Sequence, residues 1–155
     1  MDEIQNELVF DEATHRYSLN GYILPSVTQI MKPLSSAEYK DVGESVLRNA
    51  AMRGSAVHEA IEYKIKYDFD DCPAEYEAYF NAFKDFTRDY SPEWIHSEMR
   101  TYHRQLMYAG TVDLICKISG ETFLVDFKTT SEINHMLTRV QLEAYAQALN
   151  SFGID

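Results

Sequence analysis

Two short segments in the C-terminal third of the chain each carry one aspartate among apolar residues. They read Gly-Thr-Val-Asp-Leu-Ile at 110–115 and Phe-Leu-Val-Asp-Phe-Lys-Thr at 123–129. Both are typical of β-strands, and side chains alternate between the two faces of a strand, so Asp126 and Lys128 should point the same way. Burying two carboxylates and a lysine among apolar neighbours costs free energy without compensation. A divalent metal and a phosphate group would supply that compensation.

Phosphodiester hydrolysis is a reaction that such residues could perform. It needs an activated water and relief of the negative charge on the phosphate, and Mg²⁺ or Mn²⁺ held by oxygen ligands provides both. We expect Asp113 and Asp126 to meet on adjacent strands of one hairpin and to hold the metal. Lys128 would position the water, lower its pKa or stabilise the transition state. The alternative for Asp126 and Lys128 is an ordinary exposed pair of charges on a sheet.

Composition sets broad limits on the class of protein. The chain has 155 residues, 45% of them hydrophobic and 13% aromatic, which suits one folded domain with its own core. The net charge of −11 argues against broad, nonspecific binding to nucleic acid. Cys72 and Cys116 lack the spacing of a disulfide framework or a zinc site. No apolar run is long enough for a membrane span and no targeting segment is visible, so we expect a cytoplasmic protein.

The hydrophobic pattern predicts the elements that would position these residues. The first part of the chain predicts strands separated by the turn signal Asn20-Gly21, and then a short helix that Pro33 ends. A helical region follows, which Gly54 could kink or interrupt, and a second helix opens at Pro73 and carries an aromatic stripe. The predicted strands cover 7–10, 16–19, 22–24, 94–102, 106–118 and 122–128, and the last helix covers 138–149, with Val140 among its inward-facing residues.

Several short motifs occur in a fixed order along the chain. They are Arg53-Gly54-Ser55-Ala56-Val57-His58, then Glu98, then Gly110-Thr111-Val112-Asp113, then Asp126-Phe127-Lys128-Thr129, and finally Gln141-x-x-x-Tyr145. This series resembles the PD-(D/E)XK nuclease superfamily, and the Gly-x-x-x-His segment resembles its RecB-like exonuclease branch. The opening segment 24–30 is similar to the start of phage or prophage members. The resemblance extends over most of the chain.

The resemblance implies a role for each matching residue. Asp113 and Asp126 would bind the metal, with His58 as a further ligand and the Phe127 carbonyl as a backbone ligand. Lys128 would be the catalytic lysine, and Glu98 would bind or orient the metal or its water. Gln141 and Tyr145 would touch the nucleic-acid strand, and Glu62 would support His58 from one helical turn away. Apart from the family, Glu98, Gln141 and Tyr145 are each also consistent with ordinary surface or core positions.

The resemblance also implies a fold and a domain plan. We expect a mixed α/β (α+β) protein with a restriction-endonuclease-like core, whose central sheet is mostly antiparallel or mixed and flanked by helices, after an N-terminal β-hairpin. The whole chain, 1–155, would be a single nuclease domain: 1–33 the hairpin and a short helix, 34–92 a helical region, and 93–155 the catalytic core. The family core usually adds a strand after the Gln141/Tyr145 helix. The chain would therefore be a minimal member or a fragment, and a second copy or a partner protein could complete the sheet edge.

The function that follows is cleavage of DNA phosphodiester bonds by a Mg²⁺- or Mn²⁺-dependent enzyme. It would be an exonuclease that acts on single strands or duplex ends in recombination or repair. Two alternatives come from other classes. One is a nuclease-fold binding or assembly module that no longer cleaves, and the other is an interaction protein whose acidic face mimics DNA.

Overall fold

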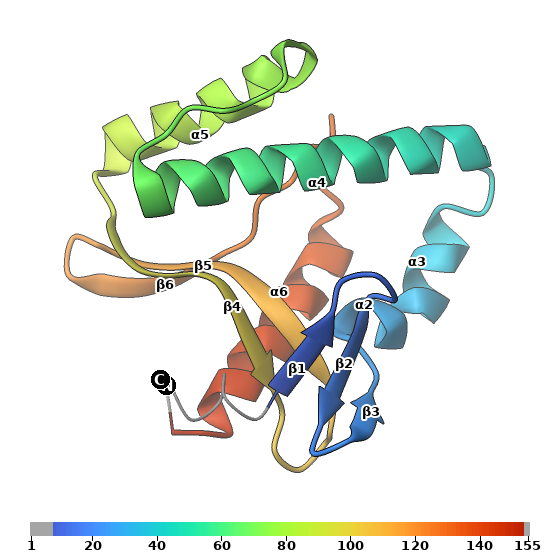
Figure 1. The fold of residues 1–155 in the computed structure, drawn as a ribbon. Helices are drawn as coiled ribbons and strands as arrows, with labels where there is room; N and C mark the ends of the chain where they lie inside the picture. Colours follow the sequence, from blue (N-terminus) through green and yellow to red (C-terminus); the bar gives the residue numbers. More distant parts are fainter. Residues whose placement is uncertain (1–7, 154–155) are drawn as a thin grey trace. The chain divides into compact units, whose positions relative to one another are not determined.

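The computed structural model describes residues 8–153. Within them it is a mixed α+β protein with two separate three-stranded sheets (Figure 1). The elements in chain order are β1 (Leu8–Asp11), β2 (Arg16–Leu19), β3 (Tyr22–Leu24), α2 (Val27–Ile30), α3 (Lys32–Glu38), α4 (Glu44–Tyr67), the 3-10 turn η1 (Ala74–Tyr76), α5 (Glu77–Tyr90), β4 (Glu93–Tyr102), β5 (Ala109–Ile118), β6 (Glu121–Val125) and α6 (His135–Asn150).

The chain forms two compact units, and each is built from separated stretches of sequence. The first contains residues 8–40, 99–112 and 134–153 of the described chain, and the second contains 41–98 and 113–133. Strands β4 and β5 therefore each run from one unit into the other, with the changes at Glu98/Met99 and Val112/Asp113. The prediction of a single domain over 1–155 stays a prediction.

In the first unit, the N-terminal sheet is an antiparallel meander in the order β1-β2-β3. The predicted turn at Asn20-Gly21 has positive φ at both residues, as a tight two-residue hairpin turn needs. Ser26 then caps α2 through a capping box with Gln29, so the short helix starts where the sequence predicted. The predicted strand at 7–10 begins at Glu7, which lies outside the described residues.

Helix α6 closes the first unit, and Tyr145 is its main buried side chain. The Tyr145 ring lies against Gly110 so closely that a Cβ at Gly110 would stand 2.5 Å from Tyr145 Cε1. Tyr108, which directly precedes β5, donates a hydrogen bond from Oη to the carbonyl of Ala144 on α6 at 2.8 Å. The prediction that Val140 faces inward is wrong, because its side chain is exposed and Leu137 and Tyr145 hold the buried face instead.

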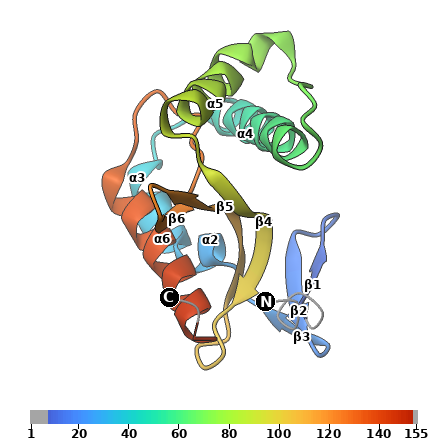
Figure 2. The ribbon, with the colours of Figure 1, turned by 90° about the vertical axis from the view of Figure 1, so that its left-hand side faces the viewer.

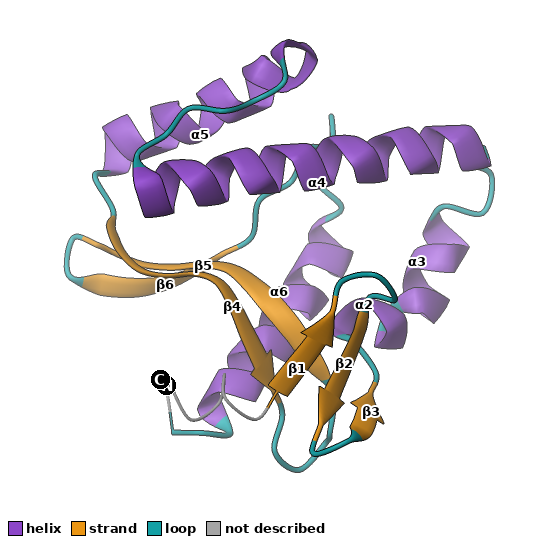
Figure 3. Cartoon of the chain, viewed as in Figure 1, coloured by secondary structure: helices purple, strands orange, loops and turns teal. Residues whose placement is uncertain are grey.

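The second unit is built on α4 and α5, which pack side by side (Figures 1 and 2). Buried Val57, Ala60 and Ile61 from α4 meet Phe80 and Phe83 from α5, so the predicted aromatic stripe is core. Gly54 lies inside α4 and does not interrupt it, although the sequence allowed a kink or interruption there. Figure 3 shows α4 as one continuous helix. Pro33 lies in the first turn of α3, where its missing N–H costs nothing, and so it starts that helix rather than ending the previous one.

The second sheet has the order β4-β5-β6, and β5 pairs antiparallel with β6 from Leu114 opposite Val125 to Ile118 opposite Glu121. Strand β6 ends at Val125, so Asp126 and Lys128 lie in the segment after the strand. The prediction that the strand extends to residue 128 is therefore wrong. Over the described part of the chain, no helix combines the length and apolar character needed to cross a bilayer.

Candidate metal centre

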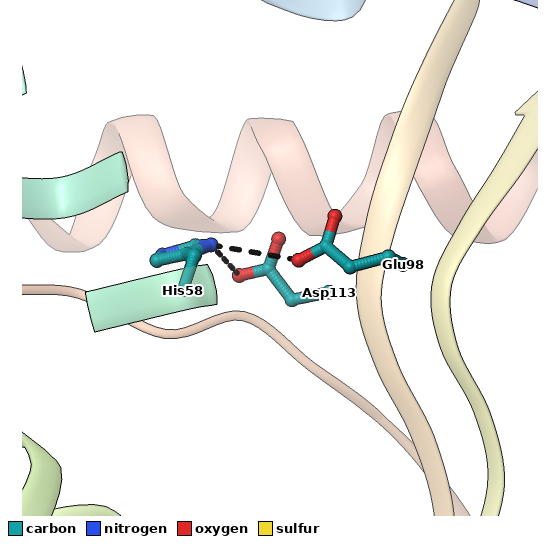
Figure 4. A group of neighbouring side chains, drawn as sticks. All are labelled: His58, Glu98 and Asp113. Carbon is teal, nitrogen blue, oxygen red and sulfur yellow. Dashed lines mark ion pairs between the residues drawn. The ribbon is translucent and has the colours of Figure 1, made fainter. Parts of the chain in front are cut away.

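Three side chains from three elements of the second unit converge on one point. His58 comes from α4, Glu98 from β4 and Asp113 from β5, and one ligand atom from each lies within 4.8 Å of the others. Figure 4 shows the two carboxylates facing the His58 ring. His58 Nδ1 lies 3.6 Å from Asp113 Oδ2 and 3.8 Å from Glu98 Oε1, which are distances of ion pairs rather than hydrogen bonds.

The segment after β6 orients two of these side chains through the backbone N–H and C=O of one residue, Phe127. The Phe127 N–H donates to Asp113 Oδ2 at 2.8 Å, and the Phe127 carbonyl lies 3.0 Å from His58 Nε2. The protonated imidazole therefore donates through Nε2 to this carbonyl and presents Nδ1 to the carboxylates. This is the usual way in which a backbone carbonyl fixes a ligand histidine. The carbonyl that was predicted as a metal ligand thus contacts His58 in this structure.

Glu98 reaches the group because the backbone of β4 is distorted at this residue. Its φ is +51, a left-handed conformation that a non-glycine residue rarely adopts within a strand. Such a conformation costs on the order of 1–2 kcal/mol and concentrates at functional sites. Sequence reasoning found Glu98 only through the family resemblance, since nothing in its neighbours signals a positive φ.

Burial and the mutual charges shift the pKa values of His58 and Asp113. Burial opposes the charge of His58, but Glu98, Asp113 and the Phe127 carbonyl outweigh it and raise the pKa of His58 to about 9. Burial raises the pKa of Asp113 to about 6, and the nearby charge of Asp126 adds to this while His58 works against it. At neutral pH His58 is therefore a positively charged imidazolium, and most of Asp113 is ionised.

Asp126 and Lys128 form a second charged pair. Lys128 Nζ lies 2.6 Å from Asp126 Oδ2, so the two side chains point the same way, as predicted. The contact is an ion pair without hydrogen-bond geometry, and it leaves the buried Oδ2 atom without a hydrogen-bond partner. Asp126 is not one of the three converging ligands. It is close enough for its charge to raise the pKa of Asp113.

The remaining predicted residues are Glu62, Gln141 and Tyr145. Glu62 forms an ion pair with Lys66 on the exposed side of α4 and has no described bond to His58. Gln141 and Tyr145 belong to the first unit, where Gln141 Nε2 donates to Tyr145 Oη at 3.3 Å and Tyr145 is buried. Tyr145 thus has the packing of a core tyrosine, one of the two readings that its sequence allowed.

The donors fit a small divalent cation. Two carboxylates and one imidazole suit Mn²⁺, and the imidazole makes the set less suited to Mg²⁺, which favours oxygen ligands only. Asp126, whose buried Oδ2 is paired with the Lys128 ammonium, is a further acidic group near the three donors. His58, Glu98 and Asp113 would hold the ion, and Asp126 would complete its surroundings.

Sequence reasoning missed two contributors to the centre. One is the Phe127 N–H, which a sequence cannot reveal because any residue type has one. The other is Arg53, whose Nε donates to the carbonyl of buried Thr129 at 3.0 Å and so ties the segment after β6 to α4. Arg53 stands next to Gly54 in the Gly-x-x-x-His motif, and that position was the only available signal.

Comparison with models of known protein families and with curated proteins finds no match for this chain.

Proposed function

We propose that the protein is a metal-dependent deoxyribonuclease with a PD-(D/E)XK-type core, and that it acts as an exonuclease in DNA recombination or repair. The observation that carries the proposal is the convergence of His58, Glu98 and Asp113 next to the Asp126–Lys128 pair. Both groups belong to the same compact unit. The donor chemistry and the adjacent lysine support phosphoryl transfer, and the sequence resemblance supports DNA as the substrate.

The bound ion would supply an activated water and a positive charge for the phosphate. The chain's own residues have distinct tasks. The backbone N–H and C=O of Phe127 hold Asp113 and His58 in place, so that the donors need not reorganise when substrate binds. Lys128, whose Nζ lies 2.6 Å from Asp126, would orient the attacking water or balance charge on a phosphate oxygen.

The test is digestion of end-labelled linear DNA and of closed circular DNA in the presence of Mn²⁺. We expect the linear substrate to be degraded and the circular one to persist. Lys128→Ala should reduce the rate by about 100-fold or more, because it removes a proton-transfer or charge-stabilising group. Its matched control is Lys84→Ala on α5, since Lys84 pairs with Asp70 and not with the centre.

Other results lead to other functions. If neither DNA is cut, while Mn²⁺ still binds and DNA is retained, the protein is a binding or assembly module. If Mn²⁺ does not bind, and a basic protein binds in a salt-sensitive manner, the acidic interaction protein is the correct alternative. Calorimetric titration of Mn²⁺ into wild type and Asp113→Asn decides between these two.

A further inference from the structure

A groove of about 230 Å³ in the second unit opens beside the Asp126–Lys128 pair. Four aromatic side chains line it: Tyr79, Phe83 and Phe86 from α5, and Phe127 from the segment after β6. Phe83 is buried and meets Phe127 edge-to-face at 5.6 Å, so these two rings form the floor. Tyr79 and Phe86 are only partly buried and form an accessible wall.

Two cationic side chains lie at this groove, and one of them is paired with Asp126. Lys128 is the only charged side chain among the described residues that line it. The Arg53 guanidinium lies 5.4 Å from the centre of the Tyr79 ring, which it holds in place while its Nε donates to the Thr129 carbonyl. On a chain of net charge −11, two cations therefore lie at this aromatic groove, Lys128 with its partner Asp126 and Arg53 against the Tyr79 ring.

The size of the groove limits its occupant. It is smaller than the ~300–1,000 Å³ of pockets that take drug-sized ligands. A single flat ring fits this space better than a whole nucleotide or an amphipathic peptide helix. Every nucleobase offers a flat face that stacks on aromatic side chains, and the phosphates on either side are attracted by cations.

We propose that this groove holds one unpaired nucleobase of the strand that is cut, next to the phosphate that Lys128 faces. The inference rests on the proposed function and makes it more specific: the preferred substrate is a single strand or a frayed end. A base held between Tyr79 and Phe86 would fix the register of the strand relative to Asp126 and Lys128. Fully paired DNA cannot occupy the groove without losing a base pair.

The experiment measures binding and not cleavage, so its result is separate from that of the proposed function. A fluorescent oligothymidylate with hydrolysis-resistant phosphorothioate linkages is titrated in Mg²⁺, and fluorescence anisotropy is recorded. The same strand is then tested with a single abasic residue placed at each position in turn. We expect one position at which losing the base weakens binding by roughly ten-fold, while the backbone charge is unchanged. Oligouridylate strands distinguish RNA from DNA as the source of the base.

The variants locate the effect in the groove. Tyr79→Ala should weaken binding of the intact strand by roughly ten-fold and abolish the abasic penalty, and Tyr79→Phe should restore both. Tyr67→Ala is the matched control, because Tyr67 is an exposed tyrosine of the same unit, at the end of α4, that does not line the groove. Equal affinity for intact and abasic strands at every position would overturn the proposal, whether or not the protein cleaves DNA. That comparison needs only wild-type protein.

Discussion

At the scale of single residues, the centre is organised around the charge of one imidazole. The pKa of His58 is about 9 because the carboxylates and the Phe127 carbonyl outweigh the effect of burial. In the metal-free protein the ring therefore carries a proton at neutral pH. A metal ion can bind Nδ1 only after that proton leaves, so metal binding and proton release are linked.

This linkage predicts a steep pH dependence of metal affinity. The pKa of His58 is raised above its ordinary 6.5, so its proton is bound below about pH 9 and lost above it. The pKa of Asp113 is raised to about 6, so a second proton competes only below that pH. We expect the Mn²⁺ affinity to rise by about ten-fold per pH unit between pH 6 and 9 and then to level off.

Calorimetric titrations in buffers of different ionisation enthalpy measure this release directly. About one proton should leave per metal ion bound at pH 7.5. His58→Ala should bind Mn²⁺ at least about ten-fold more weakly and lose most of the pH dependence. An affinity that is flat from pH 6 to 9 in wild type would show that His58 is not a ligand.

Glu98 allows backbone strain to be separated from metal binding. Replacing it with glycine removes the carboxylate but suits the φ of +51, whereas alanine removes the carboxylate and keeps the strain. We expect both variants to lose Mn²⁺ affinity to a similar extent. Glu98→Gly should be more stable than Glu98→Ala by about 1 kcal/mol in urea denaturation. Equal stabilities would mean that the backbone relaxes at this position in the variants.

At the scale of elements, close packing rather than local preference decides which glycines matter. A Cβ at Gly110 would stand 2.5 Å from the Tyr145 ring and 3.3 Å from Val27, so α6 or α2 would have to shift. A Cβ at Gly54, inside α4, would meet only Thr129 Oγ1 at 3.8 Å, an ordinary contact. The two glycines therefore differ in what they contribute to the fold.

Alanine at these two positions should change stability in opposite directions. Gly110→Ala should lower the free energy of unfolding by about 1–3 kcal/mol through overpacking. Gly54→Ala should raise it by up to about 1 kcal/mol, because alanine favours a helix interior. Urea denaturation followed by circular dichroism measures both. A neutral Gly110→Ala would show that the Tyr145 ring moves aside at little cost.

The elements that could be predicted are those with strong local signals. The Asn20-Gly21 turn, the Ser26 cap and the aromatic face of α5 each follow from residue type and spacing, and each was found. The continuity of α4 through Gly54 was not predicted, because tertiary packing of Val57, Ala60 and Ile61 outweighs the weak helix preference of one glycine.

Within the candidate site, the sequence motifs identified residues that lie close together, but they did not predict which side chains contact each other. They brought out His58, Glu98 and Asp113, which do converge. They set Asp126 beside Asp113 as a ligand, whereas β6 ends at Val125 and Asp126 faces Lys128. The end of a strand depends on pairing with its neighbour, and a single sequence contains no direct record of that pairing.

At the scale of the whole molecule, the net charge of −11 opposes the approach of a polyanion. Affinity for DNA should therefore depend on the divalent ion as well as on contacts in the groove. We expect a single-stranded oligonucleotide to bind at least about ten-fold more tightly in Mg²⁺ than in EDTA at equal ionic strength. Asp113→Asn should lose most of that difference. Equal binding in both buffers would place the DNA contacts away from the metal centre.

The positions of Glu98 and Asp113 have one more consequence. They are the residues at which the chain leaves the second unit and returns to it, so residues 99–112 form a loop whose two ends both reach the metal centre. An ion held by both carboxylates would act as a removable cross-link across the base of this loop. Because the ligands converge only in the folded chain, the ion would bind that state in preference to the unfolded one, and the melting temperature should rise with Mn²⁺ concentration. Metal supply would then govern how long the folded protein survives, in addition to whether it reacts.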